Sequence, residues 1–282
     1  MSERSSPLAA LVDRLPDPDE RGMLTNIDKE VVDNVISEIH KGGRKSIRGL
    51  IDTFVEPGAG DDVKPRYALH CLAVYVCNLN DERQRRAFAK ALASQLGGDR
   101  PKAVQGYVVR QLQVSGGQEV APALGQLLRD EELCEYAAQA LVAIGDGAAE
   151  QLRTALPQAR GKCRLTIVQN LGVVRDAKSV SALKEAVGDE DREVRLAAAW
   201  ALANIGDAGF VDVLLEAADA KSVYERIKAT QACLVLAEKL LSAGRKNEAV
   251  KIYNHLRDTR TGPAEQYIRD AAEKGLAEAG KI

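Results

Sequence analysis

A fourteen-residue pattern that returns about every thirty residues constrains this chain more than any other feature of its sequence. The clearest copy is Val194–Asp207, and Leu133–Asp146 matches it in its small residues, its leucine and its terminal Ile-Gly-Asp. The leucine that anchors each copy recurs at spacings of 29, 30 and 31 residues: Leu112, Leu141, Leu171 and Leu202. Self-similarity at a fixed period predicts a stack of structural repeats.

Each repeat is predicted to contain two helices. Apolar residues recur in the copy 194–207 at i, i+4, i+8 and i+11, which is the spacing of one helix face. We expect Gly206 to end this helix in the left-handed conformation and Asp207 to cap the next helix. Two short helices cannot bury their apolar faces alone, so neighbouring pairs must stack. The second helices are expected at Ala148–Leu156, Val180–Val187 and Gly209–Ala217.

The string Val-Arg-x-Ala-Ala-x-x-Ala-Leu-x-x-Ile-Gly-Asp resembles the HEAT repeat, and in particular the short variety named for phycobilisome lyases. Val194–Asp207 matches it at every position, and the copy at Leu133–Asp146 lacks the Arg. The resemblance covers residues 104–281 well and residues 64–78 weakly. It implies an all-α fold: a right-handed α-solenoid of HEAT-like helical hairpins with an N-terminal helical cap. It implies much less about function, because such repeats occur in lyases, hydroxylases, glycosylases and plain scaffolds.

Three regions are expected: a flexible N-terminal tail, an N-terminal helical hairpin cap and a HEAT-like repeat solenoid, at residues 1–24, 25–62 and 63–282. The tail is rich in Ser and Pro and has room for one short helix near Pro7–Arg14. The hairpin is predicted to contain the helices Ile27–His40 and Arg44–Val55, which the pair Gly42-Gly43 separates.

The composition leaves little material for catalysis or metal binding. The three His and five Cys are widely spaced, no C-x-x-C occurs, and no nucleophile lies in a recognisable frame with a base. The iron-binding HEAT-repeat hydroxylase carries His-Glu dipeptides, and this chain has none. We therefore expect no enzyme, no cofactor and no metal. The cysteines lie in apolar helical patterns, which predicts reduced thiols in a cytoplasmic protein. No apolar run is long enough for a membrane span.

The charges nearly cancel, with 39 Lys and Arg against 41 Asp and Glu. This balance disfavours a nucleic-acid partner, because such proteins usually carry a basic excess. Few aromatic residues interleave with the basic ones, which argues against base stacking. A solvated helix face is the favoured interpretation of the basic clusters, and an acidic partner or nucleic-acid phosphates are the alternative. The clusters are Lys41, Arg44, Lys45 and Arg48, and then Arg83, Arg86 and Lys90.

The seventh position of each copy is the candidate partner-binding surface. Four successive copies place Arg110, Gln139, Gln169 and Trp200 there. Ala, Leu and Ile fill the core positions, so the seventh position is expected on the exposed face. Side chains of this kind would suit an extended peptide, since amides both donate and accept and Trp supplies apolar area. Burial of Trp200 at a repeat junction stays open, as does a row of merely tolerated surface residues.

These patterns favour a non-enzymatic scaffold or adaptor that binds a partner peptide or domain in its concave groove. Two alternatives stay open. The resemblance implies a lyase- or chaperone-like assistant of cofactor (tetrapyrrole) attachment, and the arginine-rich helices would suit the phosphate backbone of a nucleic acid. The sequence predicts no particular oligomeric state.

Overall fold

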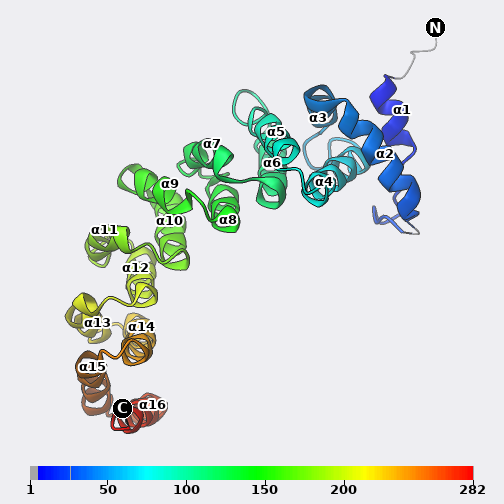
Figure 1. The fold of residues 1–282 in the computed structure, drawn as a ribbon. Coiled ribbons are helices and arrows are strands. Elements are labelled where there is room, and N and C mark those ends of the chain that lie inside the picture. The colour runs from blue at the N-terminus through cyan, green and yellow to red at the C-terminus, as the bar shows by residue number, and fades with distance from the viewer. Residues whose placement is uncertain (1–5, 26, 282) are drawn as a thin grey trace. The chain divides into compact units, whose positions relative to one another are not determined.

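The computed structural model describes residues 6–25 and 27–281, and within these ranges every regular element is a helix (Figure 1). The single β-type feature there is an isolated bridge between Pro18 and Leu24. The all-α class and the repeated helical pairs of an α-solenoid are thereby confirmed. The chain divides into two compact units, Met1–Gln151 and Leu152–Ile282. Each unit is described separately below.

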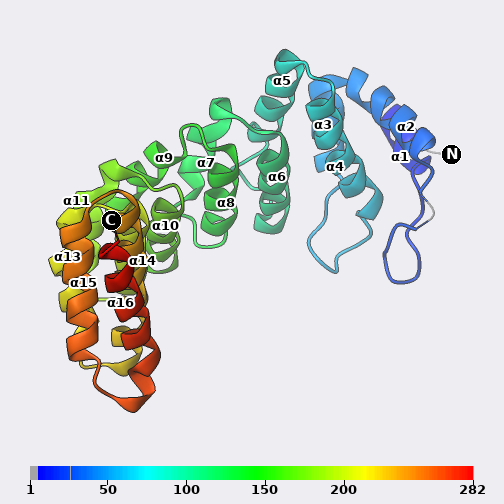
Figure 2. The same cartoon turned by 60° about the horizontal axis from the view of Figure 1, so that its bottom comes forward.

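The helices of unit 1 form two rows. Helix α4 packs on α2 and α6, and α6 packs on α8, whereas α3 packs on α5. Both views place α3 beside α5 and α4 beside α6 (Figures 1 and 2). We call α2, α4, α6 and α8 the even row, and α3, α5 and α7 the odd row. The bounds are α1 Pro7–Asp13, α2 Lys29–Lys41, α3 Gly43–Ile51, α4 Val63–Asn78, α5 Glu82–Ala93, α6 Lys102–Ser115, α7 Ala121–Leu127 and α8 Cys134–Ile144.

Capping residues set the helix starts in unit 1. The Asp28 carboxylate accepts hydrogen bonds from the backbone N–H groups of Glu30 and Val31, so α2 begins at Lys29 and not at the expected Ile27. In the same way, the Asp81 carboxylate accepts from the first N–H groups of α5. Each cap therefore fixes the residue at which its helix begins. The start of the helix in turn sets which of its residues face the neighbouring helices.

The N-terminal segment packs on the helices that follow it. Helix α1 lies where a short helix was expected, and it contacts α2, α3 and α4. Val12 and Leu15 are buried there. Residues 7–15 therefore form part of the packed body of unit 1, and the division into tail, cap and solenoid stays a prediction.

Unit 2 repeats the arrangement. Helix α12 packs on α10, α11 and α14, and α14 packs in turn on α13, α15 and α16. Its even row consists of α10, α12, α14 and α16. Helix α9, Ala148–Ala155, spans the division between the units. The bounds are α10 Gly161–Val173, α11 Val180–Ala186, α12 Arg192–Ile205, α13 Val211–Ala218, α14 Val223–Ser242, α15 Lys246–Thr259 and α16 Gln266–Ala279.

The repeat motif ends α12 as its sequence predicts. Gly206 has φ 81° and ψ 26°, which is the left-handed conformation that a glycine adopts without steric cost. The Asp207 carboxylate accepts the backbone N–H of Gly209 at 2.7 Å. The copy at residues 163–176 has Arg175 at the glycine position, and Arg175 also takes a positive φ of 52°. The backbone therefore keeps the turn even where the sequence has lost its glycine.

The arginine of the motif links three parts of unit 2. Arg195 donates to the backbone carbonyls of Asp189 and Glu190, at 2.9 and 3.1 Å, and pairs with Glu225 of the next repeat. Its side chain therefore satisfies carbonyls in the turn after α11 while it ties α12 to α14. This role explains why Arg follows Val in the repeat string.

Candidate functional site

The seventh-position residues lie on the even rows and are exposed. In unit 1, Arg110 is on α6 and Gln139 is on α8. In unit 2, Gln169 is on α10 and Trp200 is on α12, where the indole is 42% exposed. Burial of Trp200 at a repeat junction, the alternative that the sequence left open, is therefore not what the structure has. The role of these four residues in binding stays a prediction.

Trp200 is seated directly on the backbone of α10. A Cβ atom built on Gly172 would lie 2.8 Å from Cζ3 of Trp200 and 2.7 Å from Cα of Ala201. Real Cβ atoms do not approach other atoms so closely, so only glycine fits at this position. The indole therefore packs against the backbone of α10 at Gly172, which is its seat, while another part of the ring stays exposed.

Two further side chains complete an exposed surface around the indole. Gln169 and Val173 are four residues apart on α10, and hence on one helix face. Val173 is 49% exposed although it is apolar. We call Gln169, Val173 and Trp200 the Trp200 surface. It combines apolar area with one amide that can both donate and accept.

The structure adds one residue that the sequence reasoning missed. Gln231 lies on α14, exposed, 31 residues after Trp200 and at the equivalent position of the next repeat. The sequence around Gln231 departs from the repeat string, so the string did not identify this residue. Its spacing of 31 residues from Trp200 would have identified it. In the last copy the equivalent residue is Lys274, exposed on α16.

Arg110 is held by its neighbouring repeat in unit 1. Its guanidinium carbon lies 5.1 Å from the centre of the Tyr136 ring of α8. That ring in turn packs on Gly106, where an added Cβ would come within 3.1 Å of it. A cation over an aromatic face at this distance is attracted to it. The guanidinium of Arg110 therefore already interacts with the Tyr136 ring on one of its faces.

The two basic clusters of the sequence meet on the odd row of unit 1. One extends from the end of α2 along α3, the other lies on α5, and α3 packs on α5. All seven side chains are exposed. Arg48 pairs with Asp52 at 3.4 Å and Arg86 with Glu82 at 2.6 Å. The exposed members are Lys41, Arg44, Lys45, Arg48, Arg83, Arg86 and Lys90.

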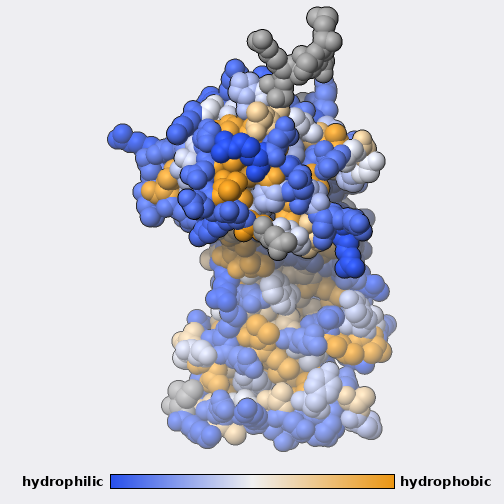
Figure 3. Space-filling view, turned by 90° about the vertical axis from the view of Figure 1, so that its right-hand side faces the viewer, coloured by the Kyte–Doolittle hydropathy of each residue, from blue (hydrophilic) through white to orange (hydrophobic). Residues whose placement is uncertain are grey.

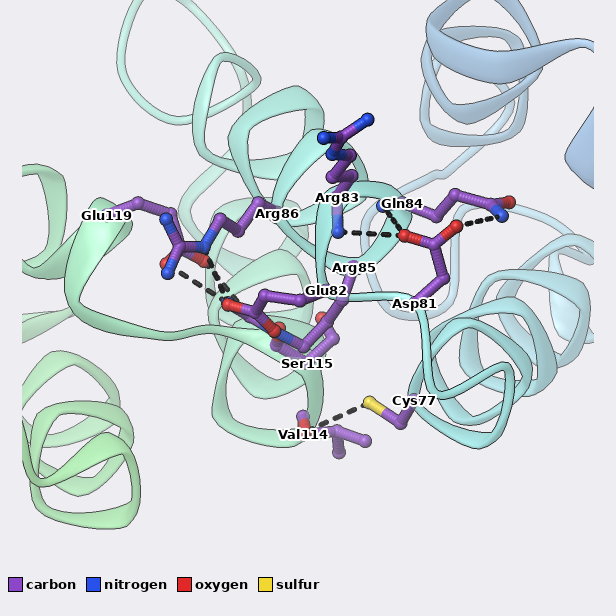
Figure 4. Close-up of polar contacts among 10 residues, drawn as sticks. All are labelled: Cys77, Asp81, Glu82, Arg83, Gln84, Arg85, Arg86, Val114, Ser115 and Glu119. Atoms are coloured by element: carbon purple, nitrogen blue, oxygen red, sulfur yellow. Dashed lines mark hydrogen bonds and ion pairs between the residues drawn. The ribbon is translucent and has the colours of Figure 1, made fainter.

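The third arginine of α5, Arg85, has a structural role. Arg85 donates to both Glu82 and Glu119 and to the backbone carbonyl of Ser115 (Figure 4). The hydrogen bonds of Arg85 and Arg86 lower the pKa of Glu82 to about 2. Burial acts to raise the pKa of Glu119, but the hydrogen bond and the charge of Arg85, together with a backbone hydrogen bond, outweigh it and the pKa is lowered. These pairs fix the first turn of α5 against the segment that follows α6.

The histidines and cysteines of the described residues form no metal-binding cluster and no disulfide. No group of three or more His, Cys, Asp or Glu among the described residues could hold a metal ion. None of the five cysteines forms a disulfide, and burial raises the pKa of the Cys233 thiol to about 12. Each histidine is hydrogen-bonded to another side chain, and the pairs are His40 with Gln84, His70 with Gln111 and His255 with Asp219.

The exposed apolar side chains extend to the N-terminal end of unit 1. Figure 3 faces this end, and apolar surface gathers there among hydrophilic side chains. Met23, Ile27 and Val31 are exposed in this part of the chain. Along the described helices, none is both long and apolar enough to cross a membrane.

Comparisons with known proteins agree with the repeat architecture. The family model of HEAT repeats matches residues 149–234. No curated protein matches the chain in sequence. A complex of CpcE and CpcF of phycocyanin lyase from Nostoc is 17% identical, with a TM-score of 0.39 over 80% of this chain and 92% of that one.

Two further solved structures are similar at the same low level. An archaeal HEAT-like repeats protein from Thermococcus onnurineus is 17% identical, with a TM-score of 0.39 over 87% of this chain and 97% of that one. Human deoxyhypusine hydroxylase is 16% identical, with a TM-score of 0.35 over 98% and 96%. Scores below 0.5 carry no argument about activity or partners. The repeat string, the stacked helical pairs and the family model matched at residues 149–234 together show that the chain is similar to HEAT-repeat proteins.

Proposed function

We propose that this protein is a non-enzymatic, cytoplasmic scaffold that binds an extended segment of a partner protein along the even-numbered helices of unit 2, with Trp200 as an anchor. HEAT repeats are typical of protein-interaction scaffolds, because stacked helical pairs present long continuous surfaces. The observation that carries the proposal is the exposed indole on its seat at Gly172. A rigid aromatic side chain loses little entropy when a partner covers it.

The free energy available at Trp200 is large enough for an anchor. A Trp side chain has up to about 250 Å² to bury. At 42% exposure, about 100 Å² is left for a partner to cover. At about 25 cal/mol per Å², covering this area contributes about 2.5 kcal/mol, which lies within the range of binding hot spots.

The amide side chains give the surface its proposed preference for main-chain groups. In unit 2, Gln169 offers a donor and an acceptor, which match the carbonyl and the N–H of an extended peptide, and in unit 1 Gln139 offers the same two groups. Gln231 offers the same pair of groups one repeat beyond Trp200. Arg110 adds a cation in unit 1, although its interaction with Tyr136 reduces the free energy that it can contribute to the binding of a partner.

The test is affinity capture from native lysate followed by mass spectrometry, with the double variant Gln169→Ala and Trp200→Ala. We expect the variant to lose the partner that the wild type retains, with an unchanged circular dichroism spectrum. Met23→Ala is the matched control, because Met23 is an exposed apolar residue that precedes α2 in unit 1. Equal recovery of the partner by the wild type and the double variant would contradict the proposal.

The alternative of assistance in tetrapyrrole attachment derives from the repeat resemblance alone. No set of residues in this chain supports it specifically. A covalently attached or tightly held tetrapyrrole after co-expression, visible in the absorption spectrum, would favour it over a scaffold.

A further inference from the structure

The seam between α3 and α5 concentrates positive charge in a chain that is slightly acidic as a whole. Helix α3 carries three basic side chains and no acidic one, and α5 carries four basic side chains and one acidic one. The two helices therefore have a net charge of +6, against −2 for the whole chain. Since α3 packs on α5, this charge lies on two adjacent helices of unit 1.

Within the described part of the chain, five basic side chains here form no ion pair and donate no hydrogen bond: Lys41 at the end of α2, Arg44 and Lys45 of α3, and Arg83 and Lys90 of α5. Figure 4 shows the Arg83 side chain extending away from the carboxylates of Asp81 and Glu82. Arg44 and Lys45 lie in the first turn of α3, and Arg83 in the first turn of α5. The helix dipole disfavours cations at a helix start, so helix stability does not explain these residues.

The seam also has apolar recesses between its charged rims. A pocket of about 230 Å³ lies between the two helices, with Ile47, Leu72, Ala87 and Phe88 in its lining and Arg44 at its side. The hydrogen bond between His40 and Gln84, at 2.6 Å, lies beside it. A pocket of this size accepts an aliphatic side chain.

A wider depression lies at the other end of the seam, where Arg48, Ile51 and Ser94 contribute to its walls. Asp52 also lies there, but Arg48 and Arg100 pair with it at 3.4 and 2.5 Å. Asp52 is therefore already compensated, whereas Asp99, also in the lining, is exposed. The pocket at Ala87 has no carboxylate in its lining, so the end of the seam near the start of α3 suits an acidic ligand best.

We propose that the α3–α5 seam binds an acidic segment of a partner protein in which carboxylates are interspersed with aliphatic side chains. The carboxylates pair with the rim cations, and an aliphatic side chain enters the pocket at Ala87. Helix α5 has 12 residues and is about 18 Å long, which matches about five or six residues of extended chain. This site goes beyond the proposed function, because it uses the odd row and does not require Trp200.

Two observations favour a protein segment over a nucleic acid. The one aromatic residue of α3 and α5 is Phe88, which is buried, so these helices offer no platform on which a base could stack. The pocket is lined with apolar side chains, and a phosphate backbone makes no use of such a recess. An aliphatic side chain of a peptide does.

The experiment measures fluorescence anisotropy with three labelled probes. The first is a peptide of about ten residues that combines Glu and Asp with Leu. The second has Ser in place of each Leu, and the third is a single-stranded oligothymidylate of about equal charge. Each is titrated with the full-length protein at about 50 and about 200 mM salt, because ion pairing weakens as salt rises.

The first peptide is expected to bind most tightly, and more tightly at the lower salt. The variant Arg44→Glu with Lys90→Glu is expected to weaken the binding of this peptide by about tenfold or more, because two cations that attract its carboxylates become anions that repel them. A matched charge change elsewhere, Lys221→Glu with Lys246→Glu, is expected to have little effect. Ala87→Gln fills the pocket and is expected to remove the preference for Leu over Ser. Gln169→Ala with Trp200→Ala is expected to leave the affinity unchanged.

Three results would overturn the proposal: no binding of the first peptide at low salt, equal affinity for the wild type and the Arg44→Glu, Lys90→Glu variant, or tighter binding of the oligothymidylate at the same residues. Misfolding does not confuse the outcome, because these side chains are exposed and unpaired. Glu at position 44 would also suit the start of α3. Circular dichroism and thermal unfolding of each variant check this directly.

Discussion

A buried arginine after α15 offers a sharp test of how the C-terminal repeats are held together. Arg260 is 2% exposed. Its guanidinium donates to the backbone carbonyl of Ala218, to Thr230 at 3.3 Å and to Asp219 at 3.2 Å. Its own backbone carbonyl accepts from Arg269 of α16. One side chain thus joins the end of α13 to α14 and α15.

The substitution Arg260→Met keeps much of the volume and removes every donor. The Ala218 carbonyl loses its buried charged donor, which costs about 1–3 kcal/mol. Asp219 is half exposed and keeps its ion pair with His255 at 3.0 Å. The loss of its ion pair with Arg260 therefore adds at most about 1 kcal/mol to the destabilisation. We therefore expect a loss of about 1–4 kcal/mol in the unfolding free energy of the repeats around α14.

Hydrogen exchange resolved along the chain is the assay, because repeat proteins unfold in parts and one melting temperature averages over them. Amides of α13, α14 and α15 are expected to lose protection. Arg257→Met is the control, since Arg257 pairs only with the adjacent Asp258 on the surface, and its effect is expected to stay within about 0.5 kcal/mol. If Arg260→Met keeps the protection of the wild type in these helices, the network does not stabilise unit 2 and the reasoning is refuted.

Three other predictions concern local backbone and charge. Arg175→Gly is expected to stabilise the protein by about 1 kcal/mol, because a non-glycine residue is strained at its positive φ, and urea unfolding measures the gain. Gly206→Val is expected to cost about 1–2 kcal/mol for the same reason, and an unchanged urea midpoint would contradict it. Burial acts to raise the pKa of Asp176, but hydrogen bonds from Ser179 and Arg153 lower it below 3.8. Its contribution is therefore present above pH 3.8 and lost as pH falls further, so Asp176→Asn should flatten the acid limb of a urea midpoint against pH series.

The repeat string accounts for most of the fold because it encodes helix ends as well as helix faces. The helix expected at Val180–Val187 is α11, Val180–Ala186, and the one expected at Gly209–Ala217 begins with a 3-10 turn before α13 at Val211. The 3-10 turn precedes α13 because the Asp207 carboxylate accepts the backbone N–H of Gly209, which lies within this turn. Boundaries of this kind depend on which N–H a cap reaches, which periodicity does not specify.

The surfaces were predictable only in part. The exposure of Trp200 could be predicted, because polar residues occupy the equivalent positions of the other repeats. The packing of its indole against Gly172 could not, because it depends on how closely α10 approaches α12. The two basic clusters lie about forty residues apart in the sequence. They come together because α3 and α5 occupy the same place in successive repeats, at the N-terminal end, where the string is weakest.

The seat of Trp200 also makes the protein its own optical probe. Trp200 is the single tryptophan of the chain, so all indole emission comes from the contact between α10 and α12. At 42% exposure the emission maximum should lie between those of buried and free indole. A segment that covers the even row should shift it to shorter wavelength, whereas one that occupies the α3–α5 seam should leave it in place. One spectrum, recorded without any label, thus reports which of the two surfaces a ligand has found.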